Sequence, residues 1–319
     1  MLELQNFVNG EWIGGQNSID NINPADTRDV INQVVLGSAA DIDSAVQAAR
    51  KAFPAWRNAT PQIRHDLLDA IGNAILARKE EYGKILSREE GKTLPEGIGE
   101  TVRAGQVFKF FAGEALRCSG EFISSVRPGI DIEVIREPLG VVGIITPWNF
   151  PIAIPAWKIA PALAFGNCVV FKPATSTPGT AYILAKLFEE FGGPPGVLNM
   201  VIGGGADVGE ALVTHPDIAA ISFTGSVGTG SAIVAKCGIA QKRVQVEMGG
   251  KNPMIVMEDA DLTIAVAACV NGAFFSTGQR CTASSRFVVH QAVHDEFVAR
   301  VTKAMSKLRI GDPMEATTD

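Results

Sequence analysis

The sequence lacks any long block of like charge. Its net charge is −6 with a pI near 5.4, and Lys and Arg are not clustered, which argues against a nucleic-acid partner. The absence of charge runs also argues against a disordered interaction tail. The chain has 319 residues, of which 46% are hydrophobic and 19% charged. This composition is typical of a globular protein long enough for two domains.

The sequence also lacks a Cys-x-x-Cys pair. Its cysteines are odd in number and widely spaced, which favours reduced thiols in a cytoplasmic protein over a disulfide framework. They are Cys118, Cys168, Cys237, Cys269 and Cys281. His290 and His294 have the spacing of a metal pair, but no third ligand lies nearby. We therefore expect no metal site.

A secretion signal is not evident, because the first seven residues lack a basic start and an apolar core. The uncharged stretch 138–157 resembles a membrane span, but it contains four prolines, which a lipid-exposed helix cannot accommodate. We expect this stretch to form a buried strand, a loop and the start of a helix, and we expect no membrane segment.

Short apolar runs alternate with helical stretches from Gly140 onward, which predicts an α/β fold with a doubly wound parallel sheet. The predicted strands are 141–145, 168–171, 197–202, 218–223, 244–246 and 254–256, and the predicted helices are 155–164, 178–191, 208–215 and 227–237. Before them, Thr60-Pro61 begins a predicted helix, a second covers 96–116, and the first third reads as helices. After them, a helix from Asp261, a strand at 286–290 and a helix at 292–308 begin a second α/β unit.

Alternating residues flank a Pro128-Gly129 turn, which predicts a hairpin within 117–137. The edges of an isolated hairpin must be paired or covered. This hairpin is therefore a candidate subunit contact in a homo-oligomer.

Glycines follow the strand 218–223 in the turn Thr224-Gly225-Ser226-Val227-Gly228-Thr229-Gly230, before a helix. Such a turn lets backbone amides approach a phosphate at a helix N-terminus. The usual G-x-G-x-x-G pattern is absent, and glycines that serve only packing are the alternative. Lys172-Pro173-Ala174 follows the strand 168–171 directly, and a doubly wound sheet binds its ligand at the carboxyl ends of its strands.

Three residues suggest acyl chemistry. Cys281 lies on a Gly-Gln-Arg turn, and its thiolate can attack a carbonyl carbon. Glu247 lies beside a double glycine, and its carboxylate can take a proton from that thiol or from a later water. Asn149, within Pro147-Trp148-Asn149-Phe150-Pro151, could donate its amide N–H to an oxyanion. Each alone has an ordinary structural explanation, such as an inert buried thiol or a turn asparagine.

Together, Pro147–Pro151, Lys172–Ala174, Phe223–Ser226, Glu247–Lys251 and Gly278–Cys281 resemble the aldehyde dehydrogenase superfamily. The resemblance implies a thiohemiacetal at Cys281, hydride transfer to NAD or NADP, and hydrolysis of the thioester assisted by Glu247. It also implies a cofactor domain at 1–249 and the start of a catalytic domain at 250–319. The implied cofactor-binding residues are Thr146, Pro147, Trp148, Lys172, Ala174, Thr175, Gly205, Phe223, Thr224, Gly225, Ser226, Gly230, Glu247, Met248 and Gly249. Thr175 stands where NAD-selective members often have Glu, which favours NADP or dual use.

Within the superfamily, residues 275–286 look most like bacterial α-ketoglutaric semialdehyde dehydrogenases. This implies a carboxylated semialdehyde substrate, with Arg280, Trp157 and Phe150 as candidate substrate-binding residues. A role for Arg280 in supporting the fold alone fits its position equally well. Succinate semialdehyde and non-phosphorylating glyceraldehyde-phosphate dehydrogenases are alternative members.

Family members run considerably further than Asp319. The resemblance therefore implies either a fragment or a naturally short chain. If residues 1–319 are the whole polypeptide, we expect weakened dinucleotide binding, little catalysis and self-association through unpaired edges. A catalytically silent chain that binds NAD(P) or associates with other subunits is the alternative from a different class.

Overall fold

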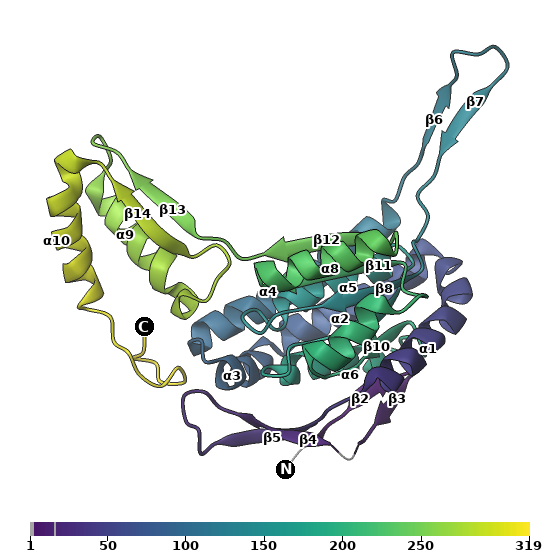
Figure 1. Cartoon of the computed structure of the whole chain (residues 1–319), viewed down its shortest axis with the longest axis horizontal. Helices are drawn as coiled ribbons and strands as arrows, with labels where there is room; N and C mark the ends of the chain where they lie inside the picture. Colours follow the sequence, from purple (N-terminus) through teal and green to yellow (C-terminus); the bar gives the residue numbers. More distant parts are fainter. Residues whose placement is uncertain (1–2, 16) are drawn as a thin grey trace.

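The computed structural model describes residues 3–15 and 17–319 and is built around a seven-stranded sheet (Figure 1). The strand order is β12-β11-β8-β9-β10-β2-β3. The five strands that run parallel are β8 (Val141–Ile145), β9 (Cys168–Lys172), β10 (Leu198–Met200), β11 (Ala220–Gly225) and β12 (Arg243–Met248). The chain adds β9 and β10 on one side of β8, and then β11 and β12 on the other. This reversal is the topology of a doubly wound sheet.

The predicted sheet was incomplete, because β2 (Asn6–Val8) and β3 (Glu11–Ile13) extend it in antiparallel register beyond β10. The expectation that the first third consists of helices was wrong, because this part also contains strands. A separate three-stranded sheet contains β1 (Glu3–Leu4), β4 (Ser18–Ile22) and β5 (Val30–Val35). A buried asparagine helps to attach the added strands, since Asn6 Oδ1 accepts the Ile202 amide at 2.7 Å. With three residues each, β2 and β3 are too short for alternation to reveal them.

Helices cover both faces of the main sheet. One face contacts α1, α7 and α8, and the other contacts α5 and α6, outside which α2, α3 and α4 form a further layer (Figure 1). The helices are α1 (Ala39–Arg57), α2 (Pro61–Ala77), α3 (Lys79–Glu90), α4 (Leu94–Leu116), α5 (Ala153–Ala164), α6 (Pro178–Glu190), α7 (Glu210–Thr214) and α8 (Val227–Ile239). A single π-helical turn, η1 (Gly205–Gly209), precedes α7.

The sequence explains the central strands and the helix starts. Every residue of β8 and β9 is buried, as expected for strands covered on both faces. Thr60 caps α2 ahead of Pro61, Ser226 caps α8, and Thr93 with Glu96 forms a capping box on α4. The stretch 138–157 forms β8, a loop and the start of α5. None of the helices in the described part of the chain combines the length and apolar character that crossing a bilayer requires.

The hairpin of β6 (Glu121–Ser124) and β7 (Asp131–Val134) projects away from the body of the molecule (Figure 1). All eight strand residues are exposed, including Phe122 at 70% and Ile123 at 50%. The predicted hairpin is therefore present.

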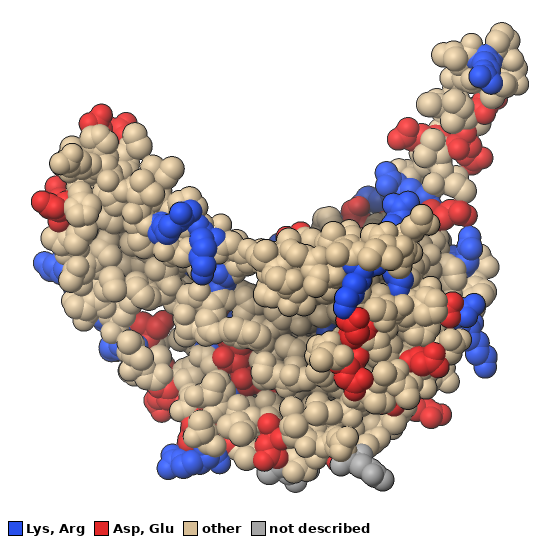
Figure 2. Space-filling view, viewed as in Figure 1, with Lys and Arg blue, Asp and Glu red and all other residues tan. Residues whose placement is uncertain are grey.

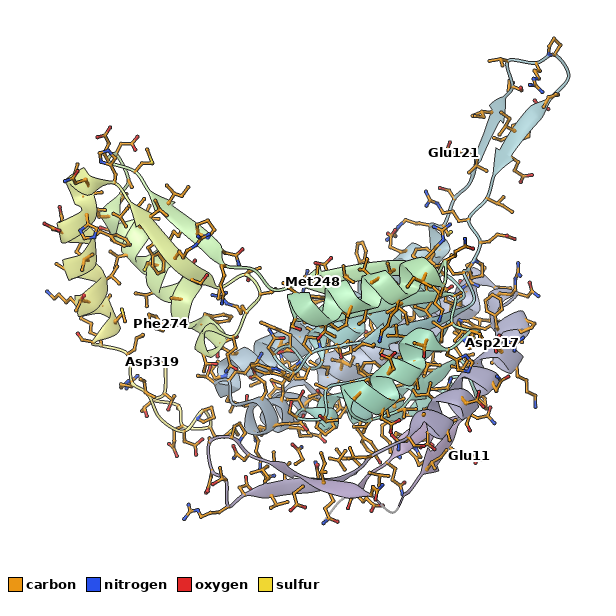
Figure 3. All side chains as sticks on the ribbon, in the orientation of Figure 1. Glu11, Glu121, Asp217, Met248, Phe274 and Asp319 are labelled. Carbon is orange, nitrogen blue, oxygen red and sulfur yellow. The ribbon has the colours of Figure 1, made fainter. Side chains whose placement is uncertain are left out.

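A second unit follows β12. β13 (Asn252–Val256) and β14 (Ser284–Val289) form a parallel pair flanked by α9 (Leu262–Phe274) and α10 (His294–Met305). The 3₁₀ turns are η2 (Phe275–Gly278) and η3 (Gln291–Val293). Its core, around Val256 and Phe297, is separate from the main core. Met248, labelled in Figure 3, lies where the chain leaves the main sheet. On the surface shown in Figure 2, Lys and Arg are interspersed with Asp and Glu.

Candidate active site

Strand register brings the candidate residues to one edge of the sheet. Ile145 pairs with Lys172 on one side and with Phe223 on the other. The loop that begins at Thr146 therefore lies between the ends of β9 and β11. Across β11, Thr224 pairs with Glu247 and Gly225 with Met248. This edge is the carboxyl end of the parallel strands at the point where their order reverses, the usual ligand site in such sheets.

The N-terminus of α8 lies at this edge. Ser226 accepts the Thr229 amide, and the earlier amides of an α-helix have no partner within it. A Cβ on Gly225 would lie 2.5 Å from the Phe223 ring, so packing favours glycine there; a Cβ on Gly230 would lie 2.5 Å from the sulfur of Met248, a flexible side chain. Gly228, in contrast, has open space on the side where a Cβ would lie, with no atom within 4 Å, which leaves the first turn open.

Lys172 extends from the end of β9 into the interior, where it is only 7% exposed. Its Nζ donates to the Pro173 carbonyl at 3.1 Å, and the ion pairs among the described residues do not include it. Burial lowers the pKa of Lys172 to about 8. The π-helical turn lies near this side chain, since a Cβ built on Gly209 would lie 3.6 Å from its Cε. Ala174 and Thr175 follow, half-buried, and Gly205 is exposed at the start of that turn.

Cys281 and Glu247, from different units, line one cavity of about 870 Å³. Both residues are exposed. Trp157 and Thr224 also line this cavity. Asn252 holds the nucleophile segment in place, because its Nδ2 donates to the Cys281 carbonyl at 2.6 Å. The two residues that the sequence singled out as nucleophile and base therefore line the same cavity.

A chain of polar groups supports Glu247 from the cavity wall. Gln245 Nε2 donates to Glu247 Oε1 at 2.9 Å. Lys158 Nζ donates to Gln245 Oε1 at 3.1 Å and to Ser222 Oγ at 2.8 Å. Burial lowers the pKa of Lys158 to about 8, while the charge of Glu247 opposes that shift. These contacts orient the carboxylate and leave its second oxygen free to take a proton.

Asn149 reaches the nucleophile segment directly. Its Nδ2 donates to the Gln279 carbonyl at 2.6 Å, two residues before Cys281. The structure thus places Asn149 against the segment that carries Cys281, while Cys281 and Glu247 line one cavity.

Residues 12–319 match the family model described as the aldehyde dehydrogenase family. The chain belongs to the aldehyde dehydrogenase family. It is 44% identical over 313 residues to α-ketoglutaric semialdehyde dehydrogenase of Bacillus subtilis, an alignment that covers 97% of this chain and 64% of the relative. It is 38% identical over 318 residues to human 2-aminomuconic semialdehyde dehydrogenase, which covers 99% of this chain and 65% of the relative. The chain thus spans about two-thirds of the length of these relatives.

Solved structures of aldehyde dehydrogenases share this architecture. A betaine aldehyde dehydrogenase from Staphylococcus aureus, in complex with NAD⁺, superposes with a TM-score of 0.97 at 36% identity, covering 100% of this chain and 66% of that one. An Escherichia coli NADP-dependent enzyme gives a TM-score of 0.96 at 37% identity, covering 99% and 66%. The family and its α/β fold are therefore established for this chain.

Of the three candidate substrate-binding residues, Arg280 does not line the cavity of Cys281 and Glu247. Its Nη2 donates to the carbonyls of Asn271 and Gly272, and its guanidinium lies 4.7 Å from the Phe275 ring centroid. Phe150 and Trp157 instead line a second cavity of about 370 Å³, with Trp157 shared between the two cavities. Arg280 therefore supports the end of α9.

Sequence reasoning missed Arg103 and Lys158. Arg103 lines the second cavity from α4, and the hydrogen bonds and ion pairs found in the described part of the chain include none from its guanidinium. A charged residue inside an otherwise apolar stretch was the available signal for Lys158. No such signal was available in the sequence for Arg103, because a basic residue on an outer helix is ordinary.

Within residues 3–15 and 17–319, no three His, Cys, Asp or Glu side chains gather as a possible metal site.

Proposed function

We propose that this chain carries the active site for NAD(P)-dependent oxidation of an aldehyde to a carboxylic acid. The observation that carries the proposal is the shared cavity of Cys281 and Glu247. Residues 1–249 would hold the cofactor and residues 250–319 would supply the nucleophile. The direct test is NAD(P)H formation from a panel of neutral and carboxylated aldehydes, and wild-type protein that converts none of them would refute the proposal.

The reaction would proceed in three balanced steps. The Cys281 thiolate adds to the aldehyde carbon, and the Asn149 amide stabilises the resulting oxyanion. Loss of hydride from that carbon collapses the oxyanion to a thioester on Sγ. A water that gives its proton to Glu247 then attacks the thioester, releasing the acid and the thiolate. The nicotinamide, when bound, supplies the acceptor for the hydride.

The residues present fit a dinucleotide. The open first turn of α8 suits a pyrophosphate, because helix N-termini favour anions. Lys172, without a carboxylate partner in the described structure, can donate to a ribose or a phosphate. Thr146, Pro147 and Trp148 follow β8 between these two elements. Similar proteins include one solved with NAD⁺ and one described as NADP-dependent.

Cofactor choice would depend on Thr175, which carries no negative charge to repel a 2′-phosphate. We expect NADP to bind at least as tightly as NAD, as measured by titrating both and following protein fluorescence. Thr175→Glu is the matched variant and should shift preference towards NAD. A preference of the wild-type protein for NAD of tenfold or more, about 1.4 kcal/mol, would contradict this prediction.

For the substrate we propose a short aldehyde with a distal carboxylate. Trp157 lines both cavities, and Arg103 is the unpaired cation of the second cavity among the described residues. Glu96 and Glu100 line it too, but both accept hydrogen bonds from the protein itself. A carboxylate of a semialdehyde bound at Cys281 would therefore meet Arg103 rather than Arg280.

The prediction for Arg103→Met is a fall of about 10- to 100-fold in kcat/KM for a five-carbon semialdehyde acid, the size expected for one charged hydrogen bond. A neutral aldehyde of equal length should be oxidised at the wild-type rate. Steady-state kinetics on both substrates measure the ratio. Arg280→Met is the control and should affect both substrates equally. A loss in kcat/KM only for the semialdehyde acid in this variant would identify Arg280 as the residue that binds the carboxylate. A phosphorylated aldehyde in the same panel tests phosphate as the preferred anion.

We also propose that the exposed hairpin of β6 and β7 mediates association between copies of this chain. Its strand residues expose apolar side chains on both faces, and a two-stranded ribbon is marginally stable alone. Pairing with a second copy would cover these edges and side chains.

A further inference from the structure

The N-terminal half of α4 contacts both loops that carry the candidate active site. We call residues 146–152, between β8 and α5, the Asn149 loop. We call residues 275–283, between α9 and β14, the Cys281 loop. Glu96 and Glu100 lie one turn apart on α4 and both line the second cavity. One carboxylate contacts the Cys281 loop and the other contacts the Asn149 loop.

Glu100 and Lys92 form an ion pair that is closed off from solvent. Lys92 Nζ donates to Glu100 Oε2 at 2.7 Å, and their side chains are 1% and 2% exposed. Burial raises the pKa of Glu100, and the Lys92 charge opposes that shift. Such a pair is not explained by stability, because apolar residues of similar volume often stabilise a core as well.

The remaining hydrogen bonds of this pair go to the Asn149 loop and the residue after it. Lys92 Nζ donates to the Asn149 carbonyl at 2.9 Å and lies 4.0 Å from the centroid of the Phe150 ring. Glu100 Oε1 accepts the amides of Ile152 and Ala153, both at 3.1 Å. The loop is therefore held at the backbone of Asn149 itself and again where α5 begins.

Glu96 holds the other loop at a strained point. Its Oε1 accepts the Ser276 amide at 2.7 Å. Ser276 and Thr277 have φ values of 49° and 54°, a left-handed conformation that non-glycine residues rarely adopt. Strained backbone of this kind persists only where surrounding contacts fix it. The bond from Glu96 also joins the main body of the molecule to the second unit.

We propose that Glu96 and the buried Glu100–Lys92 pair are positioning residues, which set the Asn149 amide and the Cys281 thiol at the separation that oxyanion stabilisation needs. This inference rests on the proposed function. None of the three side chains needs to touch the substrate's reacting atoms. They act through the two loops. Removing them should therefore lower kcat only in a protein that still has the Asn149 side chain.

The test is a double-mutant cycle. Lys92→Met/Glu100→Leu replaces the pair with neutral side chains of similar size. Every protein in the cycle also carries Glu90→Gln, because the buried Glu90 carboxylate lies 3.8 Å from Lys92 Nζ and would otherwise lose its cation. We expect kcat to fall at least about tenfold with KM within about threefold, because small displacements at a reacting centre are costly. In an Asn149→Ala background the same double substitution should cost less than about threefold. Equal losses in the two backgrounds would overturn the inference.

Thr101→Val is the matched control, since its buried hydroxyl donates only to the Gly97 carbonyl within α4. It should have the same small effect in both backgrounds.

For the Cys281 loop, Glu96→Ala should change the rate of Cys281 alkylation by iodoacetamide, whereas Glu96→Gln, which keeps an acceptor oxygen, should restore the wild-type rate. An alkylation rate unaffected by Glu96→Ala would remove Glu96 from the proposal.

A measurement without turnover separates this inference from the proposed function. Hydrogen exchange in Lys92→Met/Glu100→Leu should become at least about tenfold faster at Ile152 and Ala153, and remain unchanged in β8 and β9, because the lost acceptor protected only those amides. If the wild-type protein oxidises no aldehyde, the proposed function fails and this exchange pattern still tests the contacts. Unchanged exchange at both amides would overturn them.

Discussion

Replacing Cys281 by alanine should abolish NAD(P)H formation from every aldehyde, with a loss in kcat/KM of at least about 10⁴-fold, as for other enzymes that lose their nucleophile. No neighbouring thiol can substitute. Cys168, Cys237 and Cys269 are buried, and burial raises the pKa of the Cys168 thiol to about 12. A buried thiol with a raised pKa supplies little thiolate.

The matched control is Cys118→Ala, which removes the other exposed thiol. It should retain wild-type kinetics. Circular dichroism should show the same fold for both variants, because neither side chain packs in a core. Iodoacetamide should inactivate the wild-type and Cys118→Ala proteins with one alkyl group on Cys281, identified by mass spectrometry. Turnover that survives in Cys281→Ala would refute the assignment of the nucleophile.

The central fold could be predicted from sequence because its strands are continuous apolar runs. Val141–Ile145 was predicted with the bounds that the structure shows, and the run 168–171 falls one residue short of β9. Strands β1 to β3 were missed, since they have only two or three residues each. The attachment of β2 to the main sheet depends on partners almost 200 residues away, such as Ile202 for Asn6. Local patterns carry no record of such contacts.

Part of the candidate site could likewise be predicted from the sequence, and part could not. Cys281, Glu247 and Asn149 lie in short motifs with distinctive residues; Cys281 and Glu247 line one cavity, and Asn149 bonds to the segment that carries Cys281. The residues that support them have no such motif. Lys92 and Glu100 read as ordinary charges near a helix start, yet both are buried. Arg280 was considered for the substrate because of its place in the sequence next to Cys281, whereas its side chain bonds to the end of α9. Side-chain direction depends on the tertiary fold.

Glu247→Gln should separate the two proton transfers open to this carboxylate. If Glu247 activates the water that hydrolyses the thioester, thiohemiacetal formation and hydride loss remain fast and hydrolysis becomes slow. We then expect a burst of about one equivalent of NAD(P)H per active site, followed by a steady state at least about 10²-fold slower than wild type, the usual contribution of a general base. Stopped-flow absorbance at about 340 nm, where the reduced nicotinamide absorbs, records both phases.

The alternative role gives a different time course. If Glu247 takes the proton of the Cys281 thiol, the first phase itself slows and no burst precedes the steady state, and raising the pH should restore its rate by forming thiolate. Gln245→Leu provides an intermediate case, because it removes the hydrogen bond that orients Glu247 but leaves the carboxylate. Its burst should persist with a smaller loss in the steady state. Glu258→Gln, at an exposed position outside the cavity, should change neither phase. Wild-type kinetics in Glu247→Gln would exclude both roles, and the base would have to be sought elsewhere along the cavity wall, with Lys158 the nearest candidate because burial lowers its pKa to about 8.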